Sequence, residues 1–246
     1  SRRGTQVFES TKDGAYNWNE AIRPETQAYK NFSIDEKEAE AMQKLGFGAV
    51  QSLVKDGIAR GSSTLVSLAK TTDNEVILKS ESAAQYSFNK GTSKNSYPSS
   101  IMGSIALLRQ TYYDADWYAK QDKEYNISLE EFGRLLDLPQ VFEANGLLDL
   151  FRVDRIAKEF NTTYIIKSAG DEYQRLAEVK ALNMPLVVPL NFPEAEDVSD
   201  PIEASSVSLS KLKHWEMAPA NLAFLAKENI PFAITTADLK KKNDFW

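Results

Sequence analysis

The fold class is decided by the stretch LPQVFEANGLLDLFRVDRIAKEFNTTYIIKSAGDEYQRLAEVKALNMPLVVPLNF, residues 138–192. Three apolar runs alternate here with two amphipathic helical patterns, and the runs begin 24 and 22 residues apart, a spacing typical of βα units. Because the runs are continuously apolar, we expect parallel strands that are covered on both faces. A parallel α/β barrel and a doubly wound sheet both fit this pattern. The predicted strands are 138–144, 162–169 and 184–192, and the predicted helices are 148–160 and 171–182.

Upstream of this stretch, the sequence predicts a helix over 36–45, with Ser33 as its N-cap and Glu36 completing a capping box. Polar turn residues between 64–70 and 75–80 predict a hairpin. The loop-like segment 89–100 precedes a long helical pattern, 101–121, which Ser99 or Ser100 is expected to cap; that helix should be mostly buried.

Downstream, the sequence predicts a loop over 193–206 that is rich in acids and proline. A helical pattern follows over 208–229, and Pro219 should break it. The apolar run 230–237 predicts a final strand. We expect residues 1–35 to be a polar lead and residues 36–246 to form the α/β segment.

Composition excludes several classes of protein. The chain has 246 residues, 42% of them hydrophobic, so it is long enough for one large domain or two small ones. It contains no cysteine, which rules out disulfides, cysteine-ligated zinc and cysteine nucleophiles. The net charge of −6 argues against nucleic-acid binding, and no apolar run is long enough to span a membrane.

The single histidine, His214, restricts the chemistry further, because most zinc sites and general-base catalysts need one or more imidazoles. His214 lies beside Trp215 and shortly before a proline. We therefore predict a packed or hydrogen-bonded imidazole rather than a catalytic one. The stretch DGIARG (56–61) predicts a structured turn, in which Arg60 is either solvated or paired with a nearby carboxylate.

Three charged residues mark the ends of predicted strands: Glu143, Lys167 and Asp238. Barrel enzymes keep their sites at the carboxyl ends of the strands, so these residues are candidates for a carboxylate pair or an oxygen-ligand metal site. The alternative is that these residues have no catalytic or metal-binding role, since any barrel of this size carries acidic residues at some strand ends.

Long sequence phrases give the chain a family resemblance. It resembles the large amidohydrolase-related proteins of the Bacteroidota over nearly its whole length. The phrases that carry the resemblance are GAYNWNEAIRPE (14–25), KLGFGAVQSLVKDGIARG (44–61), YPSSIMGSIALLRQTYYDADWY (97–118), the tract 138–180, KHWEMAPAN (213–221) and IPFAITTADLKKKNDFW (230–246).

The resemblance implies a TIM-like (β/α) barrel of the amidohydrolase type, with zinc or a similar divalent metal as cofactor. The superfamily holds this metal with an HxH pair after the first strand, histidines after the fifth and sixth, and an aspartate after the eighth. At the matching strand ends this chain offers Phe142 or Glu143, Lys167 or Ser168, and Ala237, with Asp238 one residue later. It contains no HxH pair.

From these departures we infer a non-catalytic, incomplete barrel segment without a metal cofactor, whose partner is the remainder of a longer chain or another subunit. The absence of an initiator methionine agrees with a segment. The resemblance also implies export to the periplasm or cell surface. Two alternatives remain open: a hydrolase of small amides or cyclic amides that uses Glu143, Lys167 and Asp238 as an altered metal site, and a module that binds peptides or glycans.

Overall fold

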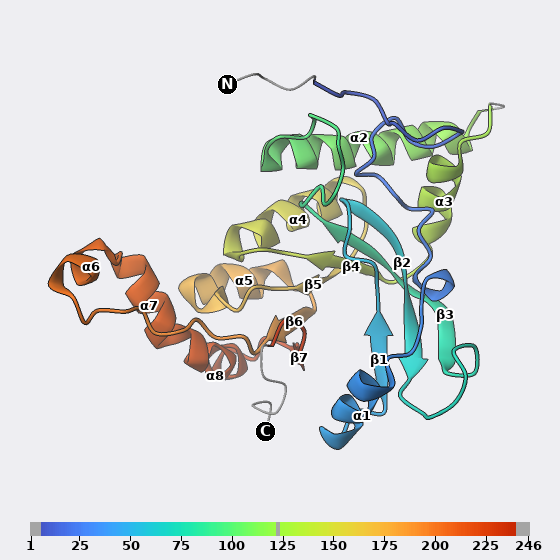
Figure 1. Cartoon of the computed structure of the whole chain (residues 1–246). Helices are drawn as coiled ribbons and strands as arrows, with labels where there is room; N and C mark the ends of the chain where they lie inside the picture. The colour runs from blue at the N-terminus through green and yellow to red at the C-terminus, as the bar shows by residue number, and fades with distance from the viewer. Residues whose placement is uncertain (1–5, 122–123, 240–246) are drawn as a thin grey trace. The chain divides into compact units, whose positions relative to one another are not determined.

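The computed structural model describes residues 6–121 and 124–239, so the last part of the predicted segment 36–246 lies outside the described residues. The chain divides into two compact units (Figure 1). The first unit comprises the residues up to Glu143 together with Phe160–Thr162, and the second comprises Ala144–Glu159 and the residues from Thr163 onward. Both units combine helices with strands, which confirms the predicted α/β class.

The first unit is built on four strands that pair in chain order. The first three are antiparallel to one another, and the third and fourth are parallel, with Ser87 opposite Glu143 at their carboxyl ends. The predicted hairpin is confirmed, although its strands extend well beyond the predicted ranges. The four strands are β1 (Ala49–Ser52), β2 (Ala59–Ser67), β3 (Ile77–Ser87) and β4 (Gln140–Glu143).

The start of β2 corrects the prediction of a turn over 56–61. Gly57 does lie in a turn with a φ of +97°, but Ala59, Arg60 and Gly61 already belong to the strand. The polar lead supplies the reason, because Ile22 and Gln27 make parallel bridges to Ala59 and Ser62. These bridges satisfy backbone groups at the start of β2, which no local sequence pattern reveals.

The helices of the first unit test the capping predictions. Ser100 caps the long helix by accepting from the amide of Gly103, as predicted. Asp35, and not Ser33, caps the helix after the polar lead, because its carboxylate accepts from the amides of Lys37 and Glu38. Two helical elements were not predicted, the 3-10 helix within residues 28–30 and the short α-helix that Asn126 caps. The elements are η1 (Ala28–Lys30), α1 (Glu36–Lys44), α2 (Ile101–Ala119) and α3 (Ile127–Leu135).

The two faces of the first unit's sheet differ in character. One face carries Tyr86 and Phe142, whose rings stack at 6.3 Å between centroids, and Phe132 of α3 meets Tyr86 edge-on. Tyr112 of α2 contacts Phe132 at 4.9 Å, so α2 and α3 cover this aromatic face. Side chains alternate along a strand, and the opposite face therefore carries the polar residues described below.

The second unit contains three parallel strands, β5 (Tyr164–Lys167), β6 (Leu186–Pro189) and β7 (Phe232–Thr235), which pair in that order. They occupy three of the predicted apolar runs but are shorter than predicted. The predicted break at Pro219 is confirmed, since a 3-10 turn there separates two helices. The helical elements are α4 (Leu147–Glu159), η2 (Glu172–Arg175), α5 (Leu176–Leu182), α6 (Pro201–Ser206), α7 (Leu209–Met217), η3 (Ala218–Ala220) and α8 (Asn221–Lys227).

None of the helices in the described part of the chain is long and apolar enough to cross a membrane.

Candidate functional site

Glu143, the last residue of β4, is held by two cations of the first unit. Its Oε2 lies 2.5 Å from Nη1 of Arg60, and its Oε1 lies 3.8 Å from Nζ of Lys55. Arg60 is 5% exposed and also donates from Nε to the carbonyl of Gly57, so its guanidinium is fixed from two sides. The pairing of Arg60 with a carboxylate, one of the two roles considered for it, is therefore what the structure contains.

Uncharged polar side chains extend the polar face around this ion pair. The Ser63 hydroxyl accepts from Nε2 of both Gln51 and Gln85 at 2.9 Å and donates to the carbonyl of Ala83. Ser63 and Gln85 are almost fully buried, yet their side-chain hydrogen bonds are made within the sheet. These bonds explain how a face this polar remains folded, because buried polar groups are stable when they are hydrogen-bonded.

Lys167 and Asp238, the other two candidates, meet in the second unit. Nζ of Lys167 lies 2.6 Å from Oδ2 of Asp238, which joins the end of β5 to the residues that follow β7. The Lys167 side chain is 17% exposed and that of Asp238 is 50% exposed. The structure thus pairs two of the three candidates with each other, while Glu143 belongs to the first unit.

These residues do not fit the divalent metal that the resemblance implies. Zinc is bound by imidazole nitrogens, thiolates or carboxylate oxygens, whereas a protonated lysine or arginine offers no lone pair. Each carboxylate at these strand ends faces such a cation, and the single histidine lies on α7. Within residues 6–121 and 124–239, no three His, Asp or Glu side chains form a cluster that could hold a metal ion.

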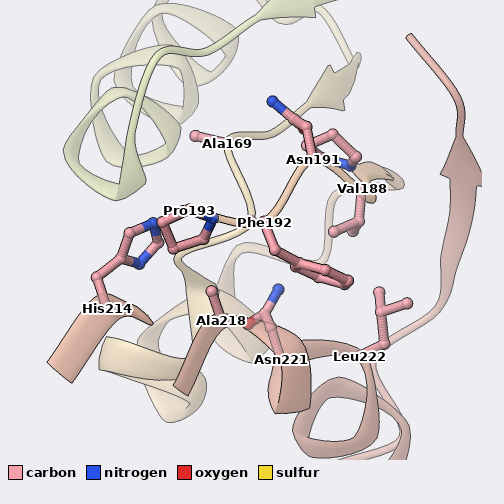
Figure 2. Close-up of a pocket in the computed structure, with 11 residues that line it drawn as sticks. Ala169, Val188, Asn191, Phe192, Pro193, His214, Ala218, Asn221 and Leu222 are labelled. Atoms are coloured by element: carbon pink, nitrogen blue, oxygen red, sulfur yellow. The ribbon is translucent and has the colours of Figure 1, made fainter. Parts of the chain in front are cut away.

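The second unit also has a shallow pocket at the carboxyl ends of β5 and β6, which sequence reasoning did not identify (Figure 2). The space between its lining residues, open solvent included, is about 270 Å³. Figure 2 shows His214 next to Pro193 and the side chain of Asn221 directed toward Phe192. Most of the lining residues are apolar, and Asn191, His214 and Asn221 supply polar side chains.

Hydrogen bonds fix both of these side chains. Asn221 is 2% exposed; its Nδ2 donates to Oε2 of Glu172 at 2.5 Å, and its Oδ1 accepts from the amide of Tyr173 at 2.8 Å. The Tyr173 hydroxyl lies 3.1 Å from Nδ1 of His214. Burial raises the pKa of Tyr173, so the hydroxyl keeps its proton at neutral pH. The prediction of a packed, hydrogen-bonded His214 is confirmed.

Comparison with known proteins gives one clear structural relationship. No protein-family model matches the chain, and no curated protein sequence matches it. The fold is similar to the crystal structure of an amidohydrolase from Thermotoga maritima MSB8, with a TM-score of 0.65 and 18% sequence identity. The match covers 95% of this chain and 64% of the amidohydrolase chain, so this chain spans less than two thirds of that structure. At this identity the similarity establishes a shared fold.

Proposed function

We propose that this chain is an incomplete amidohydrolase-like barrel segment that does not itself catalyse hydrolysis. One observation carries the proposal: the strand ends at which the superfamily holds its metal are occupied here by the ion pairs Arg60–Glu143 and Lys167–Asp238. A cation beside each carboxylate repels a divalent metal and takes up the oxygen lone pairs that would bind it. The fold similarity to an amidohydrolase supports the barrel part of the proposal.

In this proposal the segment provides a binding surface for its partner and does not itself catalyse a reaction. Its partner is the remainder of a longer chain or another subunit, which the coverage of only 64% of the amidohydrolase structure supports. By family resemblance we place the protein outside the cytoplasm, in the periplasm or at the cell surface. The proposal concerns this chain alone and is compatible with a complete catalytic site in the partner.

The test is metal binding by the purified chain. After incubation with zinc, dialysis against a weak chelator should leave well below one zinc per chain by plasma mass spectrometry. Glu143→Gln and Asp238→Asn should leave that value unchanged, because neither carboxylate is a ligand. A surface variant, Asp137→Asn, serves as the matched control, since Asp137 is exposed and precedes β4, at whose opposite end Glu143 lies.

The competing hypothesis, a hydrolase with an altered metal site, makes the opposite prediction. One retained zinc per chain that disappears in Glu143→Gln or Asp238→Asn, but not in Asp137→Asn, would establish the altered site and refute our proposal. Quenching of tryptophan fluorescence by a peptide or glycan, without product formation, would instead favour a binding module.

A further inference from the structure

The second unit carries a projecting segment, residues 192–217, which we call the acidic arm. It contains α6 and α7, neither of which buries a single residue. Figure 1 shows these two helices extending away from the rest of the second unit. Near its base the arm is held by the contact of His214 with Tyr173 and by the burial of Ala218 just beyond it. The remaining side chains of α6 and α7 therefore do not serve the core of their own unit.

The arm exposes an unusual amount of apolar surface. Of the eight large hydrophobic side chains that the described part of the second unit exposes, six lie on the arm. Leu209, Leu212 and Trp215 follow one another at three-residue spacing, which places them on one face of α7. An exposed apolar stripe of this kind is typical of an interaction surface. The six residues and their exposed fractions are Phe192 46%, Val198 54%, Ile202 79%, Leu209 67%, Leu212 41% and Trp215 48%.

The arm also carries most of the net charge of the chain. It has six carboxylates and two lysines, a net charge of −4, whereas the whole chain has 35 acids and 29 bases, a net charge of −6. The other 220 residues together account for only −2. Glu196 pairs with Lys211 at 3.1 Å, so one of the two lysines is already engaged within the arm. The six carboxylates are Glu194, Glu196, Asp197, Asp200, Glu203 and Glu216.

We infer that the acidic arm docks a basic amphipathic helix of another polypeptide. A helix of this type buries its apolar face against the leucine and tryptophan side chains of α7, while its lysines and arginines meet the five carboxylates of residues 194–203. The pair of Glu196 with Lys211 brings this acidic segment next to α7. The negative charge of the arm argues against other binding partners. A second copy brings the same −4, and nucleic acid and anionic lipid are also negative. The inference goes beyond the proposed function and does not depend on the absence of a metal site.

The test uses the whole chain and a labelled synthetic helical peptide with leucine on one face and lysine on the other. Fluorescence anisotropy should show saturable binding that weakens as salt is added, because part of the attraction is between exposed charges. A peptide of the same pattern with glutamate in place of lysine should not bind.

Substitutions on the arm locate the binding. The double variant Leu209→Ser and Leu212→Ser should weaken binding about tenfold or more, since two apolar anchors are lost. Both side chains are exposed, so the variant should fold normally. The matched control is Leu78→Ser with Met102→Ser, which changes two equally apolar, exposed side chains of the first unit. It should bind the lysine peptide as the wild type does.

Four results of the peptide-binding and self-association measurements would overturn the inference. These are no binding of the lysine peptide, equal binding of the glutamate peptide, equal weakening by the arm variant and its control, and self-association of the wild type that the arm variant abolishes. The last result would show that the arm binds a second copy of this chain. Binding to uncharged phosphatidylcholine vesicles, lost in the arm variant, would assign it to a membrane surface and would equally refute the proposal.

Discussion

The two units place charge differently at the ends of comparable strands. In the first unit β4 ends at Glu143, whose partner Arg60 is 5% exposed and bonded to backbone as well. In the second unit β5 ends at Lys167, whose partner Asp238 is half exposed. Of the twenty buried polar or charged side chains in the described residues, fifteen belong to the first unit. Buried polar groups are thus concentrated in the first unit, whereas buried charged side chains occur in both, Glu20 and Arg60 in the first and Asp149, Asp154 and Glu172 in the second.

This difference matters because the two kinds of ion pair have different energetic consequences. Breaking a buried pair leaves an uncompensated charge away from water, while an exposed pair is screened and contributes little. Glu143 and Lys167 are themselves similarly exposed, at 20% and 17% of their side chains. Their partners differ, with Arg60 at 5% and Asp238 at 50%, and this difference separates a structural pair, Arg60–Glu143, from a surface pair, Lys167–Asp238.

The largest expected effect comes from the buried pair. Glu143→Leu removes the carboxylate that compensates Arg60, and we expect the free energy of unfolding to fall by about 3 kcal/mol. Urea denaturation followed by tryptophan fluorescence measures the change. The double variant Arg60→Met with Glu143→Leu should recover most of the loss, because neither charge then remains buried. A double variant no more stable than Glu143→Leu would contradict the interpretation of this pair as a compensated buried charge.

Acid should destabilise the first unit through Glu20. Its carboxylate accepts hydrogen bonds from the side chain of Thr11, then from the amide of Lys94, and these bonds lower its pKa from 4.5 to about 2. Because the folded-state pKa is lower than the unfolded one, the stabilisation is complete above about pH 4.5 and is lost as the pH falls toward 2.

The measurement is unfolding free energy as a function of pH. Over this interval we expect a loss of about 2 kcal/mol that Glu20→Gln removes, since a neutral amide does not titrate. Asp137→Asn, an exposed carboxylate of the same unit, should leave the pH dependence unchanged. The same slope in wild type and Glu20→Gln would show that other carboxylates dominate acid sensitivity.

The smallest effect is expected at the surface pair. Lys167→Met should change the free energy of unfolding by less than about 1 kcal/mol, because Asp238 remains hydrated when its partner is removed. Any change should shrink in high salt. If the free energy of unfolding fell as much as in Glu143→Leu, the distinction between the two pairs would be wrong, and Lys167–Asp238 would be a structural pair of the same kind as Arg60–Glu143.

Sequence reasoning was accurate for most local signals, although it placed the N-cap of α1 at Ser33 instead of Asp35. The apolar runs that became β4, β5, β6 and β7 were recognised, as were the cap at Ser100 and the break at Pro219. It failed where partners come from far along the chain. The early start of β2 depends on the bridges from Ile22 and Gln27. The short helix α3 was also missed, because its apolar residues pack against α2 and the sheet, which are distant in the sequence.

The candidate site shows the same limit. Sequence identified Glu143, Lys167 and Asp238 as charges at strand ends, yet the spacing contains no information on their partners. Asn221 was missed, because an asparagine at the start of a helix gives no sign that its amide will bond Glu172, forty-nine positions away. An asparagine among apolar residues, just after a helix-breaking proline, was the only available signal.

The sequence by itself determined the α/β class, the lack of cysteine, the single histidine and the concentration of negative charge in residues 192–217, since all of these are matters of composition and local periodicity. Only the tertiary structure decided that Glu143 is bound to a buried arginine, that Lys167 faces Asp238, and that the apolar side chains of the acidic arm are exposed. The physical reason is that pairing and burial depend on which segments meet in space, and residues as far apart as Arg60 and Glu143 are brought together by the sheet rather than by their sequence neighbours.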